Sequence, residues 1–442
     1  ENYYKRLYAT IYLANLVIER FDAAESEVKA RNIAEAKFFR AICYFELTTL
    51  WGTPPLVDRV LKNSEEYKVP NSTAEQLWKF METDLTEAIT SGKLTSKTSL
   101  EDRDGGTRAT LEAARCLLGK IYLYQEKYAD AKSELEKVIS SGKYDLIADV
   151  STFYHPASAG CKEYVLECVR HYDPSNMYSQ EGWFGILANW GFGYGFIAGP
   201  EASMHYKFNT TSGYSYFNPS KSLYDAFVAE EGADGYRLNA WIRTWEQVIA
   251  MNIAVNTTTN KYASEGYFRL KWLASTDDEF VGYWCGNQSN TPVIRYADVL
   301  LMAAEACLQA GDQAGADEYL GRVRDRARLP RKSHVTLSDI KLERRLELAM
   351  EGMRFQDLKR WGDAPAVLAD KGKKLPTFQI VPDPNNDLTT AAGIYNARYT
   401  TKTTYVDNEK SLAGWTPNRD EWLPFPENEL EVNSNLKQNP GY

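Results

Sequence analysis

The chain has 442 residues, of which 44% are hydrophobic and 25% are charged, the proportions of an ordinary folded protein. Its length exceeds what one hydrophobic core usually serves, which suggests two or three domains. The net charge of −9 argues against a nucleic-acid partner, which would need a basic face for the phosphates. The most apolar stretch, Ile186–Ala198, is shorter than the roughly 20 residues of a membrane-spanning helix and is broken by glycines.

Helical patterns begin close to the first residue. Apolar residues recur at helical spacing from Leu7 to Ile18 and again from Ala34 to Phe45, which predicts two helices joined as a hairpin. The run Leu50–Pro55 ends the second helix, because consecutive prolines cannot continue it. A third helix is predicted to begin at Ser72, with Glu75 completing a capping box.

Two later segments have the spacing of the tetratricopeptide repeat, in which small residues let two helices approach and larger residues fill the gaps between units. The first segment has Leu118, Gly119, Tyr122, Ala131, Leu135 and Val138, and the second has Ala303, Ala304, Cys307, Ala316, Leu320 and Val323. These patterns predict a mainly α-helical protein, with tetratricopeptide-like hairpins forming a right-handed superhelical scaffold. A long insertion separates the two segments in the sequence.

The helical period fades between residues 150 and 292. Short strand-like runs, such as Tyr164–Val169 and Tyr267–Trp272, alternate there with clusters of Gly, Ser, Asn and Thr, so we expect loops and small sheets packed against the helices. No flexible linker is visible. We therefore predict a helical part over residues 1–149, an irregular insertion over 150–292 and a C-terminal helical part with its tail over 293–442, packed as one compact unit.

The end of the chain, Glu421–Tyr442, has the composition of a fixed segment. Pro424 and Pro426 hold the backbone extended, Leu423 and Phe425 offer apolar anchors, and a turn follows at Asn439–Gly441. We expect this tail to be part of the packed body.

The densest charged pattern is a column of Glu343, Glu347 and Glu351 at i, i+4 spacing, with Arg344, Arg345 and Arg354 able to neutralise it. A glycosidase would need two carboxylates on opposite sides of the scissile bond, whereas side chains on one helix face point the same way. The pattern therefore favours a structural ion network.

An aromatic, glycine-rich run within the insertion is the candidate ligand site. Between Gly182 and Pro200, rings alternate with glycines, which lets a backbone approach a ligand and presents flat faces to it. The nominated residues are Trp183, Trp190 and Tyr194 for stacking and Asn189 as a polar partner, with Tyr283 and Trp284 as a second cluster. The alternative is that these rings pack as a small core under long loops. No metal or cofactor signature accompanies them.

Four segments in the same order resemble the SusD/RagB family of nutrient-binding outer-membrane lipoproteins. The segments are Ala34–Leu56, Arg295–Ala306, Arg344–Trp361 and Glu421–Tyr442, whose end reads Gln-Asn-Pro-Gly-Tyr. The resemblance extends from near the first residue to the last and leaves only residues 150–292 without a motif. It implies a SusD-like fold of helical repeats.

The resemblance also implies a function. The chain would be a surface-exposed lipoprotein of the cell outer membrane that captures oligosaccharides, or in some members peptides, without cleaving them. It would deliver them to a SusC-like TonB-dependent transporter. Family members begin with a lipid-modified cysteine and an extended segment, which this chain does not contain, and we expect part of the binding site to come from there.

Two other functions fit parts of the sequence. A helical-repeat scaffold would bind a peptide or protein on its concave face through Asn, Lys and Arg side chains. A glycoside hydrolase would need opposed carboxylates near the aromatic run, with Glu181 and Glu201 as the nearest candidates.

Overall fold

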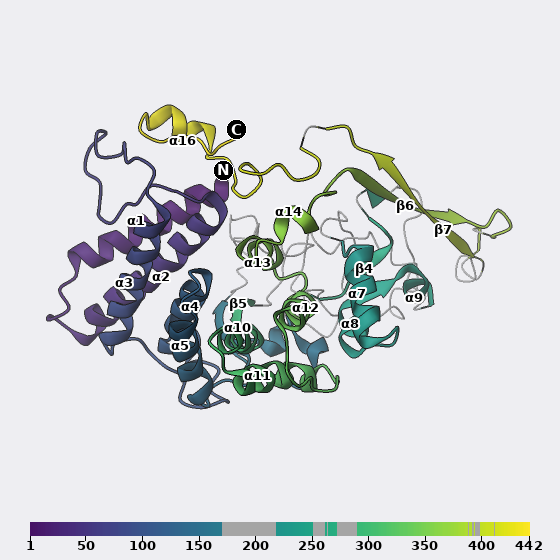
Figure 1. Ribbon diagram of the computed structural model, residues 1–442, viewed down its shortest axis with the longest axis horizontal. Coiled ribbons are helices and arrows are strands. Elements are labelled where there is room, and N and C mark those ends of the chain that lie inside the picture. The colour runs from purple at the N-terminus through teal and green to yellow at the C-terminus, as the bar shows by residue number, and fades with distance from the viewer. Residues whose placement is uncertain are drawn as a thin grey trace.

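The computed structural model describes residues 1–169, 218–250, 261–262, 264–271, 290–387, 389–390, 393, 398–410 and 412–442. Helices dominate this part of the chain, as predicted (Figure 1). Among the described helices, none combines the length and the apolar character needed to cross a membrane.

The first five helices pack in chain order. They are α1 (Asn2–Arg20), α2 (Glu27–Trp51), α3 (Ala74–Thr90), α4 (Leu111–Tyr124) and α5 (Tyr128–Ser140), and each contacts the next. The prediction for α3 was wrong by one residue. Its capping box joins Thr73 and Gln76, whereas the Ser72 hydroxyl accepts a hydrogen bond from Leu56 N.

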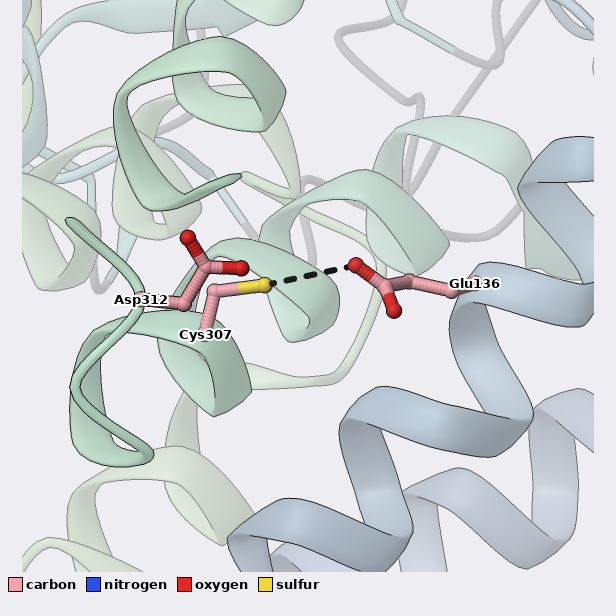
Figure 2. A group of neighbouring side chains, drawn as sticks. All are labelled: Glu136, Cys307 and Asp312. Atoms are coloured by element: carbon pink, nitrogen blue, oxygen red, sulfur yellow. Dashed lines mark hydrogen bonds between the residues drawn. The ribbon is translucent and has the colours of Figure 1, made fainter. Parts of the chain in front are cut away.

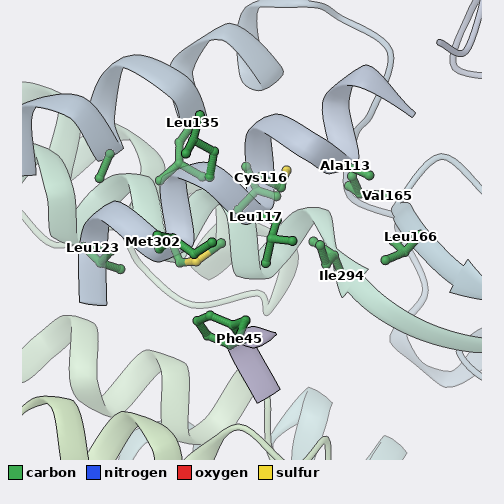
Figure 3. Packing of buried hydrophobic residues seen from close by; sticks show 14 of the residues in the cluster. Phe45, Ala113, Cys116, Leu117, Leu123, Leu135, Val165, Leu166, Ile294 and Met302 are labelled. Carbon is green, nitrogen blue, oxygen red and sulfur yellow. The ribbon is translucent and has the colours of Figure 1, made fainter. Parts of the chain in front are cut away.

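The two repeat segments form helical hairpins, α4 with α5 and α10 (Tyr296–Gln309) with α11 (Gln313–Arg326). Gly119 is required where α4 meets α5, because a Cβ there would lie 2.8 Å from Leu135 Cγ. Helix α10 packs directly against α5, so the array that is split in sequence is continuous in space (Figure 1). Met302 of α10 lies in the same hydrophobic core as Leu117 and Leu123 of α4 (Figure 3).

The insertion is attached to this array by a two-stranded antiparallel ribbon. Strand β1 (Tyr164–Cys168) follows the short 3₁₀ turns η1 (Val150–Thr152) and η2 (Pro156–Ser158), and it pairs with β5 (Thr291–Arg295), which leads directly into α10. Cys168 is opposite Thr291. The two ends of the insertion therefore leave the helical array side by side.

The described part of the insertion is more helical than we predicted. It contains α7 (Lys221–Glu231), α8 (Tyr236–Trp241) and α9 (Trp245–Ala250), together with β2 (Ile242–Thr244), β3 (Lys261–Tyr262) and β4 (Tyr267–Arg269). Ser220 caps α7 by accepting from Leu223 N. These helices are short, and α7 buries few residues, so their apolar period was too weak to detect.

The C-terminal part begins with α12 (Leu337–Glu347), α13 (Arg354–Arg360) and α14 (Ala364–Val367). Strands β6 (Lys374–Pro382) and β7 (Tyr399–Asp407) then form a long hairpin that extends away from the helices, with β3 on the other side of β6 (Figure 1). Helix α16 (Glu427–Val432) lies in the tail.

The tail is fixed to the end of α2, as predicted. Leu423 N donates to Leu50 O at 2.7 Å, and Trp51 Nε1 donates to Pro424 O at 3.0 Å. The side-chain amide of Asn439 donates to Trp51 O at 3.0 Å and to Leu423 O at 2.7 Å. Phe425 is buried in the main core. These bonds hold the end of the chain beside its beginning (Figure 1).

Candidate functional site

The six nominated ligand residues lie outside the described part of the chain: Trp183, Asn189, Trp190, Tyr194, Tyr283 and Trp284. The hydrolase candidates Glu181 and Glu201 also lie there. The structure therefore leaves these nominations as predictions. What it does describe is the frame around the insertion and three groups of side chains that could carry chemistry.

The first group is the predicted ion network, which is present and deeply buried. Glu343 and Glu347 are on α12, and Glu351 is in the turn after it. Glu347 Oε1 lies 3.1 Å from Arg295 Nη2, and Glu347 Oε2 lies 3.0 Å from Arg237 Nη1. Burial alone would raise the pKa of Glu347, but the guanidinium groups of Arg326, Arg295 and Arg237 outweigh it and lower that pKa.

The predicted partners of these carboxylates were wrong. Arg344 turns to Asp298 at 2.7 Å and Asp357 at 3.0 Å, and Arg345 donates to Ser222 O at 3.0 Å. Within the described chain Arg354 has no ion pair. The real partners come from α8, β5 and α11 and from Lys271, which follows β4. Arg344 and Arg345 point to other faces of α12, and sequence spacing could not identify partners so distant along the chain.

The network is structural. Glu343 and Glu347 are buried, and Glu343 pairs with Arg237 and, at 3.1 Å, with Arg324. Such ion pairs leave no free carboxylate to protonate or attack a glycosidic bond. They instead hold β5, α8, α11 and α12 together and so fix the base of the insertion.

The second group is a cluster of Glu136, Cys307 and Asp312, whose ligand atoms lie within 4.8 Å of one another (Figure 2). One cation of the chain already offsets part of its negative charge. Lys132 Nζ is 3.1 Å from Glu136 and 3.3 Å from Asp312. Burial, together with the nearby Glu136 and Asp312 carboxylates, raises the pKa of the Cys307 thiol to about 12, so it stays protonated. The cluster fastens α5 to α10.

The third group surrounds a pocket of about 640 Å³ that we name the tail pocket. Its walls come from the end of α2, from α3, α4 and α13, and from the tail. It is lined by Thr48, Thr49, Gly52, Thr53, Ala74, Trp78, Tyr124, Gln356, Lys359, Arg360, Gly362, Ala364, Pro365, Trp415, Glu421, Trp422, Asn439 and Pro440. A pocket of this size lies within the range of about 300–1,000 Å³ typical of small-molecule sites.

Aromatic side chains dominate the tail pocket. Trp78, Tyr124, Trp415 and Trp422 are all half-buried, so each presents part of a ring to the pocket. The Trp422 ring lies against Gly52, where a Cβ would approach Trp422 Cδ2 to 2.9 Å. Gly52 therefore allows the tail ring to pack on the end of α2.

A partly buried lysine forms part of the pocket wall. Lys359 Nζ donates to the carbonyl oxygens of Thr49 and Glu421 and lies 4.4 Å from the centre of the Trp422 ring. Burial lowers the pKa of Lys359 to about 8. This group joins α13 to both α2 and the tail.

Sequence reasoning missed the tail pocket. Its aromatic residues come from α3, α4, the tail and Trp415, which precedes the tail, and no local pattern links these parts of the chain. The available signal was at the end of the chain, where Trp415 and Trp422 occur in a polar, turn-rich segment and needed a packing surface.

Comparisons with known proteins match the whole chain to one group. A family model described as the SusD family matches residues 162–442, and one described as starch-binding and associating with the outer membrane matches residues 1–123. A SusD-like protein of Bacteroides ovatus is 25% identical over 469 aligned residues, which cover 98% of this chain and 79% of the relative.

Solved structures of SusD-like proteins are also similar to this chain. A laminarin-binding SusD-like protein has a TM-score of 0.77 at 28% identity, covering 100% of this chain and 85% of the other. Surface glycan-binding protein A from Bacteroides thetaiotaomicron, solved with laminarihexaose, has a TM-score of 0.71 at 24% identity, covering 99% and 85%. The second likeness concerns the fold alone.

Proposed function

Because the chain belongs to the SusD family, we propose that it captures oligosaccharides outside the cell and delivers them to a SusC-like TonB-dependent transporter. The observation that carries this proposal is similarity over the whole chain to a laminarin-binding SusD-like protein. The match of residues 1–123 to a family associated with the outer membrane supports that location, and anchoring there by a lipid is part of the proposal.

Within this proposal, residues 150–292 bind the glycan and the helical parts over 1–149 and 293–442 support them. Trp183, Trp190 and Tyr194 would stack on sugar rings, Asn189 would supply a polar contact, and Tyr283 and Trp284 would extend the surface. The β1–β5 ribbon and the buried ion network support this assignment, because they provide a rigid base for loops that carry recognition.

The protein would bind the glycan without cleaving it. This is supported by the Glu343, Glu347 and Glu351 carboxylates of the described chain, which are all engaged in ion pairs with arginines. Binding followed by release suits delivery to a transporter, whereas cleavage would change the cargo before uptake.

A screen of the purified protein against laminari-, malto-, cello- and xylo-hexaose by isothermal titration calorimetry tests the proposal. We expect one class of hexasaccharide to bind and the Trp183→Ala, Trp190→Ala variant to bind it at least tenfold more weakly. Release of reducing ends would instead indicate a hydrolase. Binding of peptides but of no sugar would indicate the peptide-binding alternative.

A further inference from the structure

We propose that the tail pocket is a second saccharide-binding site, which takes one or two neutral sugar rings independently of the insertion. This inference rests on the proposed function, since it supposes that the protein meets glycans. It concerns different residues, all of them described by the structure, on the helical frame and the tail.

The first argument is the form of the pocket. Trp78 and Trp415 are partly exposed and line a hollow of about 640 Å³, and Trp422, whose ring packs on Gly52 with Lys359 Nζ 4.4 Å from its centre, also borders it. Sugar rings have apolar C–H faces that fit flat aromatic surfaces, while a closed core would have buried these rings completely. The pocket is large enough for one or two sugar rings, because small-molecule sites span about 300–1,000 Å³.

The second argument is a set of polar atoms without partners. Thr48 Oγ1, Trp415 Nε1 and Glu421 Oε2 are buried and make no hydrogen bond within the described chain. All three belong to residues of the pocket wall. Trp415 needs an acceptor and Glu421 needs a donor, and a hydroxyl group can serve as either. A hydroxyl-rich ligand would complement both, whereas an aliphatic side chain would leave both unpaired.

The third argument is charge. Arg360 is neutralised by Glu305, with 2.7 Å between Nη2 and Oε2, and by Asp357 at 2.9 Å. The remaining charges of the wall, Lys359 and Glu421, are opposite in sign. The pocket therefore offers no net charge to a ligand, which favours a neutral sugar over an acidic peptide or a phosphate.

The origin of the walls indicates what part of a glycan is recognised. Trp78, Tyr124 and Trp415 lie elsewhere, but eleven of the eighteen lining residues belong to three segments: four to Ala34–Leu56, three to Arg344–Trp361 and four to the tail. These are segments with family motifs rather than parts of the insertion. Such a pocket suits the pyranose ring that many glycans share, and the insertion would then select the linkage.

The test is calorimetry with the same four hexasaccharides. For a hexasaccharide that the wild-type chain binds, we expect two sites per chain. Trp415→Ala should weaken one site at least tenfold and leave the other unchanged, while Trp183→Ala with Trp190→Ala should do the reverse. Glu421→Gln, which keeps the side-chain shape, should weaken the same site as Trp415→Ala severalfold.

Controls separate folding from binding. Tyr12→Ala removes an exposed ring from a separate hollow on α1 and should retain both sites. Each variant used must have the melting temperature of the wild type. If Trp415→Ala melts at a lower temperature, the binding result for Glu421→Gln decides the test.

Two results would overturn the inference. One is a single site that Trp183→Ala with Trp190→Ala abolishes and that neither Trp415→Ala nor Glu421→Gln affects, which leaves the proposed function intact. The other is unchanged sugar binding by the pocket variants with loss of a copurifying transporter, which would make the pocket a protein-docking surface. Failure of all four sugars to bind the wild type contradicts the proposed function as well.

Discussion

The Trp422 ring packs on Gly52, at the point where the tail crosses the end of α2. Gly52 has φ +79°, a backbone conformation that strains any other residue, and its missing Cβ leaves the space that the indole fills. One glycine thus allows the backbone turn at the end of α2 and also leaves room for the Trp422 ring of the tail.

Gly52→Ala should lower the free energy of unfolding by about 2–4 kcal/mol, because backbone strain and a 2.9 Å contact with Trp422 add together. Gly92→Ala is the matched control. Gly92 has φ +66° but nothing within 4 Å of a new Cβ, so it should lose only about 1 kcal/mol. Urea unfolding of both variants measures the difference, and equal losses would contradict the role of Trp422.

Glu347→Gln should be among the most destabilising single changes, with a loss of about 3–5 kcal/mol. The substitution removes the negative charge that Arg237, Arg295 and Arg326 share and leaves those buried guanidinium groups underpaired. Glu65→Gln breaks an exposed pair with Lys68 and should cost less than about 1 kcal/mol. A small loss for Glu347→Gln in chemical denaturation would mean that the network tolerates a neutral centre.

Lys359 should make the protein more stable as the pH rises from about 8 towards 10.5. Its pKa is about 8 in the folded chain, against 10.5 for an unperturbed lysine, so the unfolded chain binds more protons in this interval. The free energy of unfolding therefore increases with pH. Lys359→Met should lack this increase, so above pH 8 the free energy of unfolding of the wild type should rise relative to that of the variant.

Urea titrations of wild type and Lys359→Met at pH 7, 8, 9 and 10 give that comparison. Lys402→Met serves as a control, because this lysine is exposed on β7. A constant difference between the wild type and Lys359→Met would show that Lys359 has an ordinary pKa.

Asn439→Ala should loosen the tail and lower the free energy of unfolding by about 1–3 kcal/mol. The amide of Asn439 donates to the carbonyl oxygens of Trp51 and Leu423, and its loss leaves Leu423 O without this donor and Trp51 O with Thr53 N alone. Limited proteolysis should cut the variant within the tail before the wild type is cut. Asn428→Ala removes an exposed amide whose bond is to Glu1 and should leave the cleavage rate unchanged.

The helical frame could be predicted because its signals are local. Apolar spacing identified α1 and α2, and the Gly119–Leu135 contact explains why the repeat pattern identified α4 and α5. The cap of α3 was placed one residue early, since Ser72 and Thr73 are both capable of capping and only the fold selects between them.

The side-chain chemistry was harder to predict. The partners of Glu347 are Arg237, Arg295 and Arg326, which come from three other elements, so the network was foreseen and its members were not. The tail pocket was not predicted for the same reason, because residues that line it together, such as Trp78 and Trp415, are far apart in the sequence. Contacts between distant segments depend on topology, which spacing within one helix does not encode. The nominated insertion residues, Trp183 and Trp190 among them, remain predictions.

The pairing of Cys168 with Thr291 has a consequence for how such a protein can diversify. Since departure and return of the intervening segment coincide at one ribbon, a loop of another length could be accommodated there without lengthening any path through the helices, provided that Arg237 remains as a partner of Glu343 and Glu347. The same helical frame could in this way bind a different ligand after a change in one inserted segment.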